Sequence, residues 1–264
     1  MRLTFLGTGT SHGIPMIGCA CAVCRSDNPR NRRLRPSVFI EEGELNVLVD
    51  ATPDFRMQAL RADIGRVDAV LLTHSHADHV LGLDDLRVFT ERQGRKMPLY
   101  GSASSLADIQ RVFPYACTEK PAWASLPSFE LRPIEPNVEF QISGFKCRAV
   151  PLPHGRMTVF GFVLNGAVAY LTDCNAVSPE VIDSIQGIPV LVLDALRHRP
   201  HPTHLTVAGA VKIAAQIQPG LTLLTHLCHE VDHAAVETEL PADVRLAYDQ
   251  MQIEVTNGES RKLA

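Results

Sequence analysis

Three histidines and one aspartate lie close together between residues 74 and 79, in the sequence HSHADH. Neutral imidazole and carboxylate groups are common ligands of zinc and similar divalent ions. Because residues 74 and 76 alternate along extended chain, the rings of His74 and His76 can project in the same direction. Asp78 and His79 follow one turn later and can serve a second ion. We therefore predict a metal site here, in preference to a polar loop with solvated histidines.

Other histidines and aspartates occur where short apolar runs stop. The runs FKCRAVPLP and LTLLT precede His154 and His226, AVAYLT precedes Asp173, and VDAVLLT precedes His74. Short runs rich in valine and leucine, bounded by polar, glycine or proline residues, are typical of buried strands. Side chains at the ends of such strands gather along one edge of a sheet, which is where open sheets usually place their sites.

Two further aspartates, Asp50 and Asp194, also follow apolar runs, LNVLV and PVLVL. Each could accept a hydrogen bond from the N–H group of a metal-binding histidine. Each could equally be a plain strand cap, and the sequence leaves both interpretations open.

A second cluster contains Cys19, Cys21 and Cys24, three of the seven cysteines in the chain. Three soft thiolates need a fourth ligand to complete a structural zinc site. His229 is the candidate, and its neighbour Cys228 is the alternative. Three buried cysteines in a loop would be the non-functional interpretation. An odd number of cysteines in a chain without an export signal favours metal over disulfides.

The composition is that of an ordinary globular protein and limits the function classes. The 264 residues are 45% hydrophobic and 20% charged, with a formal net charge of −4. These values exclude a disordered chain, a collagen-like repeat and a disulfide-dense secreted scaffold. A mildly acidic chain is not expected to bind nucleic acids or membranes in general. No apolar run approaches the ~18–20 residues of a bilayer helix, and no signal peptide is evident, so we expect a cytoplasmic protein.

The apolar and polar pattern predicts strands that alternate with helices. Helices are expected at residues 52–62, 82–93, 178–184 and 206–216. Residues 98–136 are rich in proline and serine, contain Trp123, and are predicted to form loop and cover. Residues 259–264 are predicted to be a frayed tail. The alternation in both halves predicts an α+β fold with two packed sheets and helices outside, in a single domain of residues 1–264.

The chain resembles the metallo-β-lactamase fold superfamily, whose H-x-H-x-D-H motif residues 74–79 match at every position. The rest of the family pattern follows in order, at His154, Asp173 and His226. The resemblance implies an αβ/βα four-layer sandwich that covers nearly the whole chain. It implies one metal ion held by His74, His76 and His154, a second held by Asp78, His79 and His226, and Asp173 as the bridge between them.

Seven nitrogen and oxygen ligands are too many for one tetrahedral ion. They suit two ions, Mn or Zn, ~3.5–4 Å apart with a bridging hydroxide. Such a centre would hydrolyse an ester by attack of the metal-bound hydroxide.

Three features narrow the resemblance to the PhnP-type phosphodiesterases. They are the glycine-rich start FLGTGTSHGIP, the C-x-C-x-x-C segment, and T-H-x-x-H near the C-terminus. Those enzymes open phosphoribosyl 1,2-cyclic phosphate in phosphonate metabolism. The resemblance implies a structural zinc ion at Cys19, Cys21, Cys24 and His229, and catalytic roles for Asp78 and for His204 as general acid. The chain departs from these enzymes at His12 and at residues 197–201, which are richer in histidine and arginine.

Several basic residues have no role that the sequence decides. Arg30, Arg32, Arg33 and Arg35 form a run that we expect to be a solvated loop and not an RNA-binding patch. Arg197 or Arg199 could hold a substrate phosphate by a bidentate contact. His198 and His201 either line the pocket or face water.

The sequence therefore predicts a binuclear metal-dependent phosphodiesterase that hydrolyses a small cyclic phosphate diester. Its expected partners are a small-molecule phosphodiester and a second copy of the chain as a homodimer, with no membrane or nucleic acid. Within the same fold, thioester, lactam and RNA-processing hydrolases are alternatives, because the fold does not decide the substrate. A non-catalytic protein of pyrroloquinoline-quinone assembly is the alternative from another class.

Overall fold

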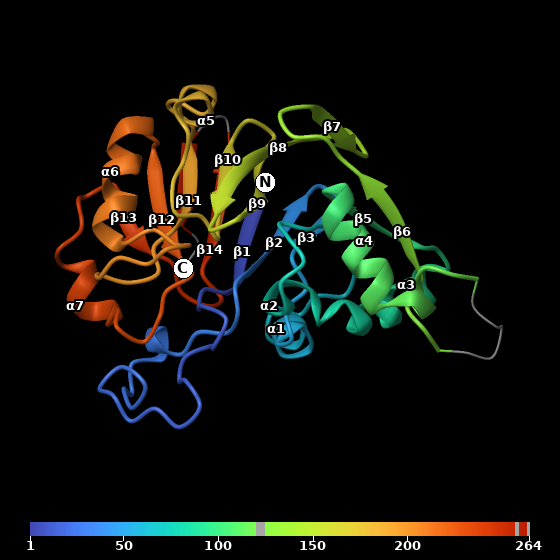
Figure 1. Cartoon of the computed structure of the whole chain (residues 1–264), viewed down its shortest axis with the longest axis horizontal. Coiled ribbons are helices and arrows are strands. Elements are labelled where there is room, and N and C mark those ends of the chain that lie inside the picture. Colours follow the sequence, from blue (N-terminus) through green and yellow to red (C-terminus); the bar gives the residue numbers. More distant parts are fainter. Residues whose placement is uncertain (120–124, 257–258, 263–264) are drawn as a thin grey trace.

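The computed structural model describes residues 1–119, 125–256 and 259–262. Two mixed sheets pack face to face, and helices cover the outer face of each sheet (Figure 1). This is the four-layer αβ/βα sandwich expected from the sequence, and the prediction is confirmed. Among the described residues, no helix is both long and apolar enough to cross a membrane.

The first sheet has eight strands in the order β15-β14-β1-β2-β3-β4-β5-β6. The strands from β3 to β6 run parallel to one another, and the remaining pairs are antiparallel. The bounds are β1 (Arg2–Gly7), β2 (Ser37–Glu42), β3 (Leu45–Val49), β4 (Ala69–Leu71), β5 (Met97–Gly101), β6 (Phe129–Pro133), β14 (Gln252–Thr256) and β15 (Glu259–Lys262).

The second sheet has seven strands in the order β13-β12-β11-β10-β9-β8-β7. Its strands from β10 to β13 are parallel, and those from β7 to β10 are antiparallel. The bounds are β7 (Glu139–Ile142), β8 (Phe145–His154), β9 (Met157–Leu164), β10 (Val168–Leu171), β11 (Val190–Asp194), β12 (Leu221–Thr225) and β13 (Val244–Leu246).

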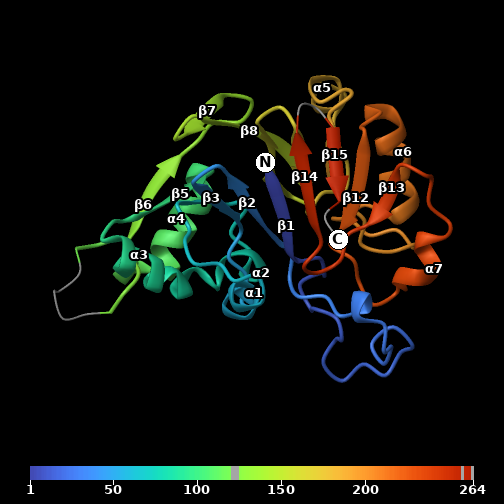
Figure 2. The same cartoon turned by 180° about the vertical axis from the view of Figure 1, so that it is seen from behind.

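The helices divide between the two outer faces, with α1–α4 on the first sheet and α5–α7 on the second (Figures 1 and 2). The longest, α6, starts at the cap Thr206, whose side chain accepts a hydrogen bond from the N–H of Gly209. The bounds are α1 (Phe55–Arg61), α2 (Ala77–Val80), α3 (Arg87–Gln93), α4 (Ala103–Val112), α5 (Pro179–Ser184), α6 (Val207–Ile217) and α7 (His233–Glu237), with short 3-10 turns at η1 (Pro29–Asn31), η2 (Leu83–Leu86) and η3 (Pro114–Ala116).

Three apolar cores hold the four layers together, and single strands contribute to two of them. In β11, Val190 and Val192 face the core between the sheets, while Leu191 and Leu193 face α5 and α6. A strand that is buried on both faces needs a continuous apolar sequence, which is why β11 lacks the alternation of a surface strand.

Two predictions about secondary structure are wrong. Residues 98–136, expected to be loop and cover, contain most of β5, helix α4 with its cap Ser102, and strand β6. Trp123 lies outside the described residues. Within the tail expected to fray at 259–264, Glu259–Lys262 form β15, which pairs with β14 (Figure 2); residues 263–264 lie outside the described residues.

Candidate metal centre and its surroundings

The predicted ligands converge at the carboxyl ends of the parallel strands of both sheets. Strands β3 and β4 end just before Asp50 and His74, and β10 and β12 end just before Asp173 and His226. At these ends Asp50, Asp173 and His226 have φ angles of 60°, 54° and 61°. Such left-handed conformations cost about 1–3 kcal/mol each in residues other than glycine and cluster at functional sites. The backbone is therefore strained at the point where the strands present these side chains.

The first group of ligands consists of His74, His76 and His154. One ring nitrogen of each lies within 4.8 Å of the others. Nδ1 of His154 donates to the carbonyl oxygen of Thr203 at 3.0 Å, which leaves Nε2 with a lone pair. The resemblance assigned these three residues to one ion, and the structure brings them together.

The second group consists of Asp78, His79 and His226, whose ligand atoms also lie within 4.8 Å of one another. Asp173 lies between the imidazoles. Its Oδ2 is 3.3 Å from Nε2 of His79, and its Oδ1 is 3.3 Å from Nε2 of His226. Asp173 also forms a close group with His74 and His79. This position between the two groups is what a bridging carboxylate requires.

Unpartnered nitrogen atoms test whether these residues fit metal ions. Nε2 of His74, of His79 and of His226 is buried and has no hydrogen-bond partner. Leaving a buried polar atom unsatisfied costs about 1–3 kcal/mol, so Nε2 of His74 in the first group and Nε2 of His79 and of His226 in the second each call for a partner. Burial lowers the pKa values of His74, His154 and His226, so these imidazoles are neutral and offer lone pairs. The residues fit divalent metal ions.

The carboxylate of Asp50 orients one of the ligands. Its Oδ2 accepts a hydrogen bond from Nδ1 of His79 at 2.7 Å and another from Oγ1 of Thr73 at 2.7 Å. Its Oδ1 accepts from the backbone N–H of Thr73 at 2.9 Å. Because Nδ1 of His79 carries the proton, Nε2 is free to bind metal. The choice left open in the sequence is thereby decided for Asp50, while the contribution of Thr73 had no recognisable sequence signal.

Asp194 plays the same part for His204, the residue expected to act as general acid. Oδ2 of Asp194 accepts from Nδ1 of His204 at 2.8 Å and from the N–H of Cys174 at 3.0 Å. The ring of His204 stacks on His226 with centroids 4.6 Å apart and lies 4.9 Å from the ring of His154. Nε2 of His204 is therefore held beside the ligand groups and in reach of a substrate bound there.

A cavity of about 190 Å³ adjoins His204 and extends toward the N-terminal loop. Ser11, His12 and His201 line it, together with Arg197 and Arg199. The guanidinium of Arg199 is already bound to Glu230 through both Nε and Nη2. That of Arg197 donates to the carbonyl oxygens of Arg199 and Pro200.

The structure thus shows neither arginine holding an open bidentate position for phosphate. His201 lies with its ring 5.1 Å from His204, and its Nδ1 accepts a hydrogen bond from the backbone N–H of Thr203. His198 is exposed and does not line this cavity.

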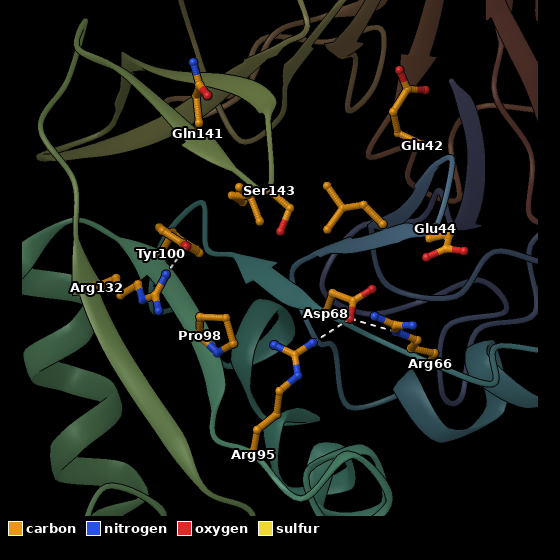
Figure 3. Close-up of a pocket in the computed structure, with 12 residues that line it drawn as sticks. Glu42, Glu44, Arg66, Asp68, Arg95, Pro98, Tyr100, Arg132, Gln141 and Ser143 are labelled. Atoms are coloured by element: carbon orange, nitrogen blue, oxygen red, sulfur yellow. Dashed lines mark hydrogen bonds and ion pairs between the residues drawn. The ribbon is translucent and has the colours of Figure 1, made fainter.

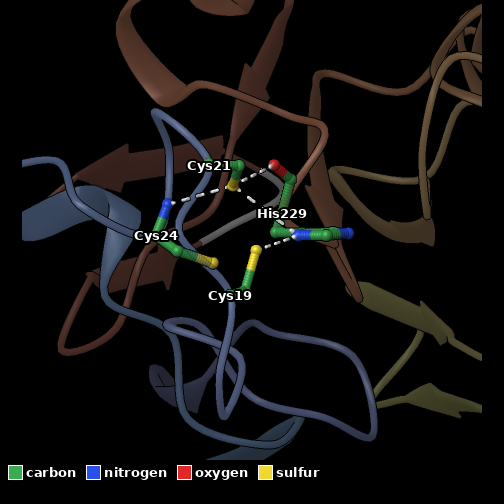
Figure 4. A group of neighbouring side chains, drawn as sticks. All are labelled: Cys19, Cys21, Cys24 and His229. Atoms are coloured by element: carbon green, nitrogen blue, oxygen red, sulfur yellow. Dashed lines mark hydrogen bonds between the residues drawn. The ribbon is translucent and has the colours of Figure 1, made fainter.

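A separate group joins the three cysteines to His229 (Figure 4). Nδ1 of His229 is 3.2 Å from Sγ of Cys19 and 3.6 Å from Sγ of Cys21. In a tetrahedral zinc site a thiolate sulfur and an imidazole nitrogen lie about 3.6 Å apart, so the spacing fits zinc. The N–H of Cys24 donates to Sγ of Cys21 and lowers the pKa of that thiol to about 6. Cys228, the alternative fourth ligand, lies outside the group, and its sulfur accepts from the N–H of Glu230.

A larger cavity, of about 680 Å³, lies at the opposite ends of the strands, near the beginnings of β3 and β4 (Figure 3). Its guanidinium groups are paired within the protein: Arg66 and Arg95 both bind Asp68, at 2.8 and 2.5 Å. None of the predicted metal ligands lines it. The chemistry of the chain is therefore expected beside the smaller cavity.

The chain is similar to a known family and to solved structures. Residues 45–227 match the Beta-lactamase superfamily domain. A solved structure of a diphosphatase from the PhnP family is 40% identical, covers 96% of this chain and 97% of that one, and superposes with a TM-score of 0.89.

Two curated proteins illustrate how widely the relatives' names vary. An octanoyltransferase of Porphyromonas gingivalis is 36% identical over 258 residues, and the chain spans only 51% of its length. Coenzyme PQQ synthesis protein B of Rhodopseudomonas palustris is 24% identical over 92% of this chain and 98% of that protein.

Proposed function

Because the chain belongs to the beta-lactamase superfamily and is a metal-dependent hydrolase, we propose that it hydrolyses a small cyclic phosphate diester such as phosphoribosyl 1,2-cyclic phosphate. We further propose two divalent ions, Mn or Zn, at the two His/Asp groups and one structural zinc ion at the thiolate group. The observation that carries the substrate class is the place of His204. Asp194 holds its imidazole beside the metal ligands, and one of its ring nitrogens lies within 4.8 Å of a ligand atom of His154 and of Asp173.

Different residues of this chain would bind the metal ions and orient the histidine ligands during phosphodiester hydrolysis. Two ions bound here would neutralise charge on the phosphoryl group and activate water for in-line attack. Asp50 keeps the proton of His79 on Nδ1, and the carbonyl oxygen of Thr203 does the same for His154. Both histidines therefore present Nε2 to the centre throughout the reaction.

His204 supplies the proton that the departing oxygen needs. A sugar alkoxide is a poor leaving group and must be protonated as the P–O bond breaks. Protonated His204 can donate from Nε2 while its Nδ1–H stays bonded to Asp194. Burial lowers the pKa of His204, although the nearby carboxylate of Asp173 opposes that shift. The free imidazole is therefore neutral, like those of His74 and His226, and must take up a proton at Nε2 before it can act as the acid.

The test compares two diesters that differ in their leaving groups. His204→Ala should lower turnover of a cyclic ribose phosphate by about 10²–10⁴-fold. It should largely spare bis(p-nitrophenyl) phosphate, whose nitrophenolate leaves without a proton. His198→Ala is the matched control, because His198 is exposed and does not line the cavity beside His204. Equal losses on both diesters would show that His204 positions substrate or metal instead.

A diphosphate is the second candidate substrate, because the 40% identical neighbour is described as a diphosphatase. The leaving group would then be a phosphate, which departs with less need of a proton. A dinucleoside diphosphate included in the same assay separates the two candidates. Preference for the anhydride, with a small effect of His204→Ala, would favour the diphosphate.

A further inference from the structure

The thiolate group and the second ligand group are attached to the same turn. His226 directly follows β12 and belongs to the second His/Asp group, and His229, three residues later, belongs to the thiolate group. Backbone hydrogen bonds hold this turn against the N-terminal segment. The N–H of Leu227 donates to the carbonyl oxygen of Thr8, and the N–H of Thr10 donates to the carbonyl oxygen of Leu227.

One buried side chain fixes the rest of the turn. Arg33 is only 1% exposed, although it belongs to the basic run expected to be solvated, so that expectation is wrong for this residue. Its Nη1 donates to the carbonyl oxygen of Cys228 at 3.1 Å, and its Nη2 donates to that of Val231 at 2.8 Å. These two carbonyl groups flank His229 on either side. Arg33 is thus hydrogen-bonded to the backbone on both sides of His229, the histidine of the thiolate group.

Arg33 is equally tied to the loop that carries the cysteines. Its backbone exchanges two hydrogen bonds with Ile14, from N–H to carbonyl in both directions. Its Nη2 also donates to Oδ1 of Asn31, whose amide nitrogen donates to Asp232. Residues 14 and 33 bracket the cysteine segment, so the paired backbone closes the loop at its base.

The charge of Arg33 has no carboxylate within ion-pair distance among the described residues. Its donors meet carbonyl and amide oxygens, and burial lowers its pKa to about 10. The carboxylates of Asp249 and Asp232 oppose that shift, but a buried cation without a direct ion-pair partner is still costly. A group of three thiolates with one divalent ion carries a net negative charge and lies on the backbone that Arg33 holds. Binding of a zinc ion by the thiolate group therefore favours the conformation in which Arg33 is hydrogen-bonded to the turn that carries His229.

We propose that Arg33 is a positioning residue that couples the thiolate group to His226, so that an ion bound by the cysteines strengthens binding of the second active-site ion. The path runs from His229 through the Cys228–Val231 backbone held by Arg33 to the preceding residues Leu227 and His226. This proposal rests on one part of the proposed function, namely that the thiolate group and the second His/Asp group both bind metal. It does not depend on the identity of the substrate. Because linkage is reciprocal, the second active-site ion strengthens zinc binding at the thiolates by the same factor.

Mn²⁺ is the probe, because this hard ion prefers imidazole and carboxylate to thiolate. Protein stripped of metal and reloaded with one equivalent of Zn²⁺ is titrated with Mn²⁺, and bound ion is counted by electron paramagnetic resonance. The same titration is carried out on Cys21→Ser, which lacks one of the three thiolates. It is also carried out on Arg33→Lys, which keeps the positive charge but cannot donate to both the Cys228 and the Val231 carbonyl oxygens. Arg32→Met is the matched control, since Arg32 is an exposed neighbour.

We expect the second Mn²⁺ to bind about 10–100-fold more weakly in Cys21→Ser and in Arg33→Lys, the usual size for a residue that supports a ligand. The first Mn²⁺ and the Arg32→Met variant should be affected by less than about threefold. In Arg33→Lys, hydrogen exchange of the Leu227 amide should also become faster. This measurement does not depend on enzymatic activity.

If Arg33→Lys does not fold, Cys21→Ser still decides the matter by comparison with zinc-loaded wild type. Unchanged affinity for the second Mn²⁺ with the thiolate group empty would overturn the proposal, and so would a thiolate group that binds no zinc. Tight, coupled binding without diesterase activity would instead refute the proposed substrate and leave the coupling intact.

Discussion

The substitution Asp50→Asn tests the account of how the ligands are held, because it changes one atom at a buried site. Both carboxylate oxygens of Asp50 accept hydrogen bonds: Oδ1 from the N–H of Thr73, and Oδ2 from Oγ1 of Thr73 and Nδ1 of His79. An amide NH₂ at the Oδ1 position would face a backbone N–H that cannot turn away. The NH₂ group will therefore occupy the Oδ2 position and donate to His79.

That arrangement moves the proton of His79 from Nδ1 to Nε2, the atom that points to Asp78 and Asp173 at 3.4 and 3.3 Å. A protonated Nε2 cannot bind metal. If the proton returned to Nδ1 of His79, this N–H would face the NH₂ group of the substituted side chain, and neither buried donor would have an acceptor. Leaving these donors unsatisfied costs about 1–3 kcal/mol. The corresponding loss is about 5–150-fold in affinity for the second ion, consistent with the 10–100-fold typical of supporting carboxylates.

The assay is titration of metal-free protein with Mn²⁺, combined with thermal unfolding of the metal-free form. We expect weaker binding of the second ion without a large drop in the melting temperature, because Asn removes a buried charge and keeps the volume. Asp194→Asn is the comparison. Oδ1 of Asp194 has no hydrogen-bond partner, so an amide can leave its oxygen at the Oδ2 position and keep both bonds. Wild-type affinity for both ions in Asp50→Asn would show that Asp50 does not keep Nε2 of His79 available to the second ion.

Three other perturbations follow from the structure. Cys21→Ser should release one zinc ion and lower the melting temperature, while turnover at saturating Mn²⁺ stays within several-fold; an inactive variant that keeps its zinc would contradict a structural role. Gly82→Ala should destabilise the protein by about 1–3 kcal/mol in denaturant unfolding, because a Cβ there meets the carbonyl oxygen of Thr52 and lies 2.8 Å from Cβ of Phe55; wild-type stability would contradict this packing. Burial raises the pKa of Asp249 from 3.8 to about 7, so its proton stabilises the folded state below pH ~4 and this contribution is lost as pH rises to ~7. In metal-free protein, the unfolding free energy of the wild type should fall over that range relative to Asp249→Asn, and parallel pH profiles would contradict the assignment.

The gathering of the His and Asp side chains at one place could be predicted from sequence because their signal is local. Each of the seven predicted His and Asp ligands directly follows a short apolar run, as His226 follows LTLLT, or belongs to the H-x-H-x-D-H segment. Strands buried on both faces show as unbroken apolar sequence, and their carboxyl ends meet wherever the strands are parallel. The same local signal could not separate a strand cap from a supporting carboxylate at Asp50. That distinction depends on His79, which approaches from helix α2 only in the folded chain.

The errors have equally specific causes. Strand β5 includes Pro98 and β6 ends at Pro133, and proline within a short run argues against a strand. Helix α4 follows the cap Ser102 and buries Leu106 and Ile109, a helical signal that the proline and serine residues of the surrounding segment obscured. Arg33 is indistinguishable in sequence from its solvated neighbours, because its burial depends on carbonyl groups nearly 200 residues away, at Cys228 and Val231.

We expect the seven His and Asp ligands to hold two ions, with Asp173 between them, and the cysteines to hold one more. Anomalous X-ray diffraction from crystals of the protein loaded with Mn²⁺ and Zn²⁺, recorded at both absorption edges, tests it most directly. We predict two peaks ~3.5–4 Å apart on either side of the Asp173 carboxylate, and a zinc peak enclosed by Cys19, Cys21, Cys24 and His229. A single peak, or none, among the seven ligands of metal-replete protein would contradict the claim.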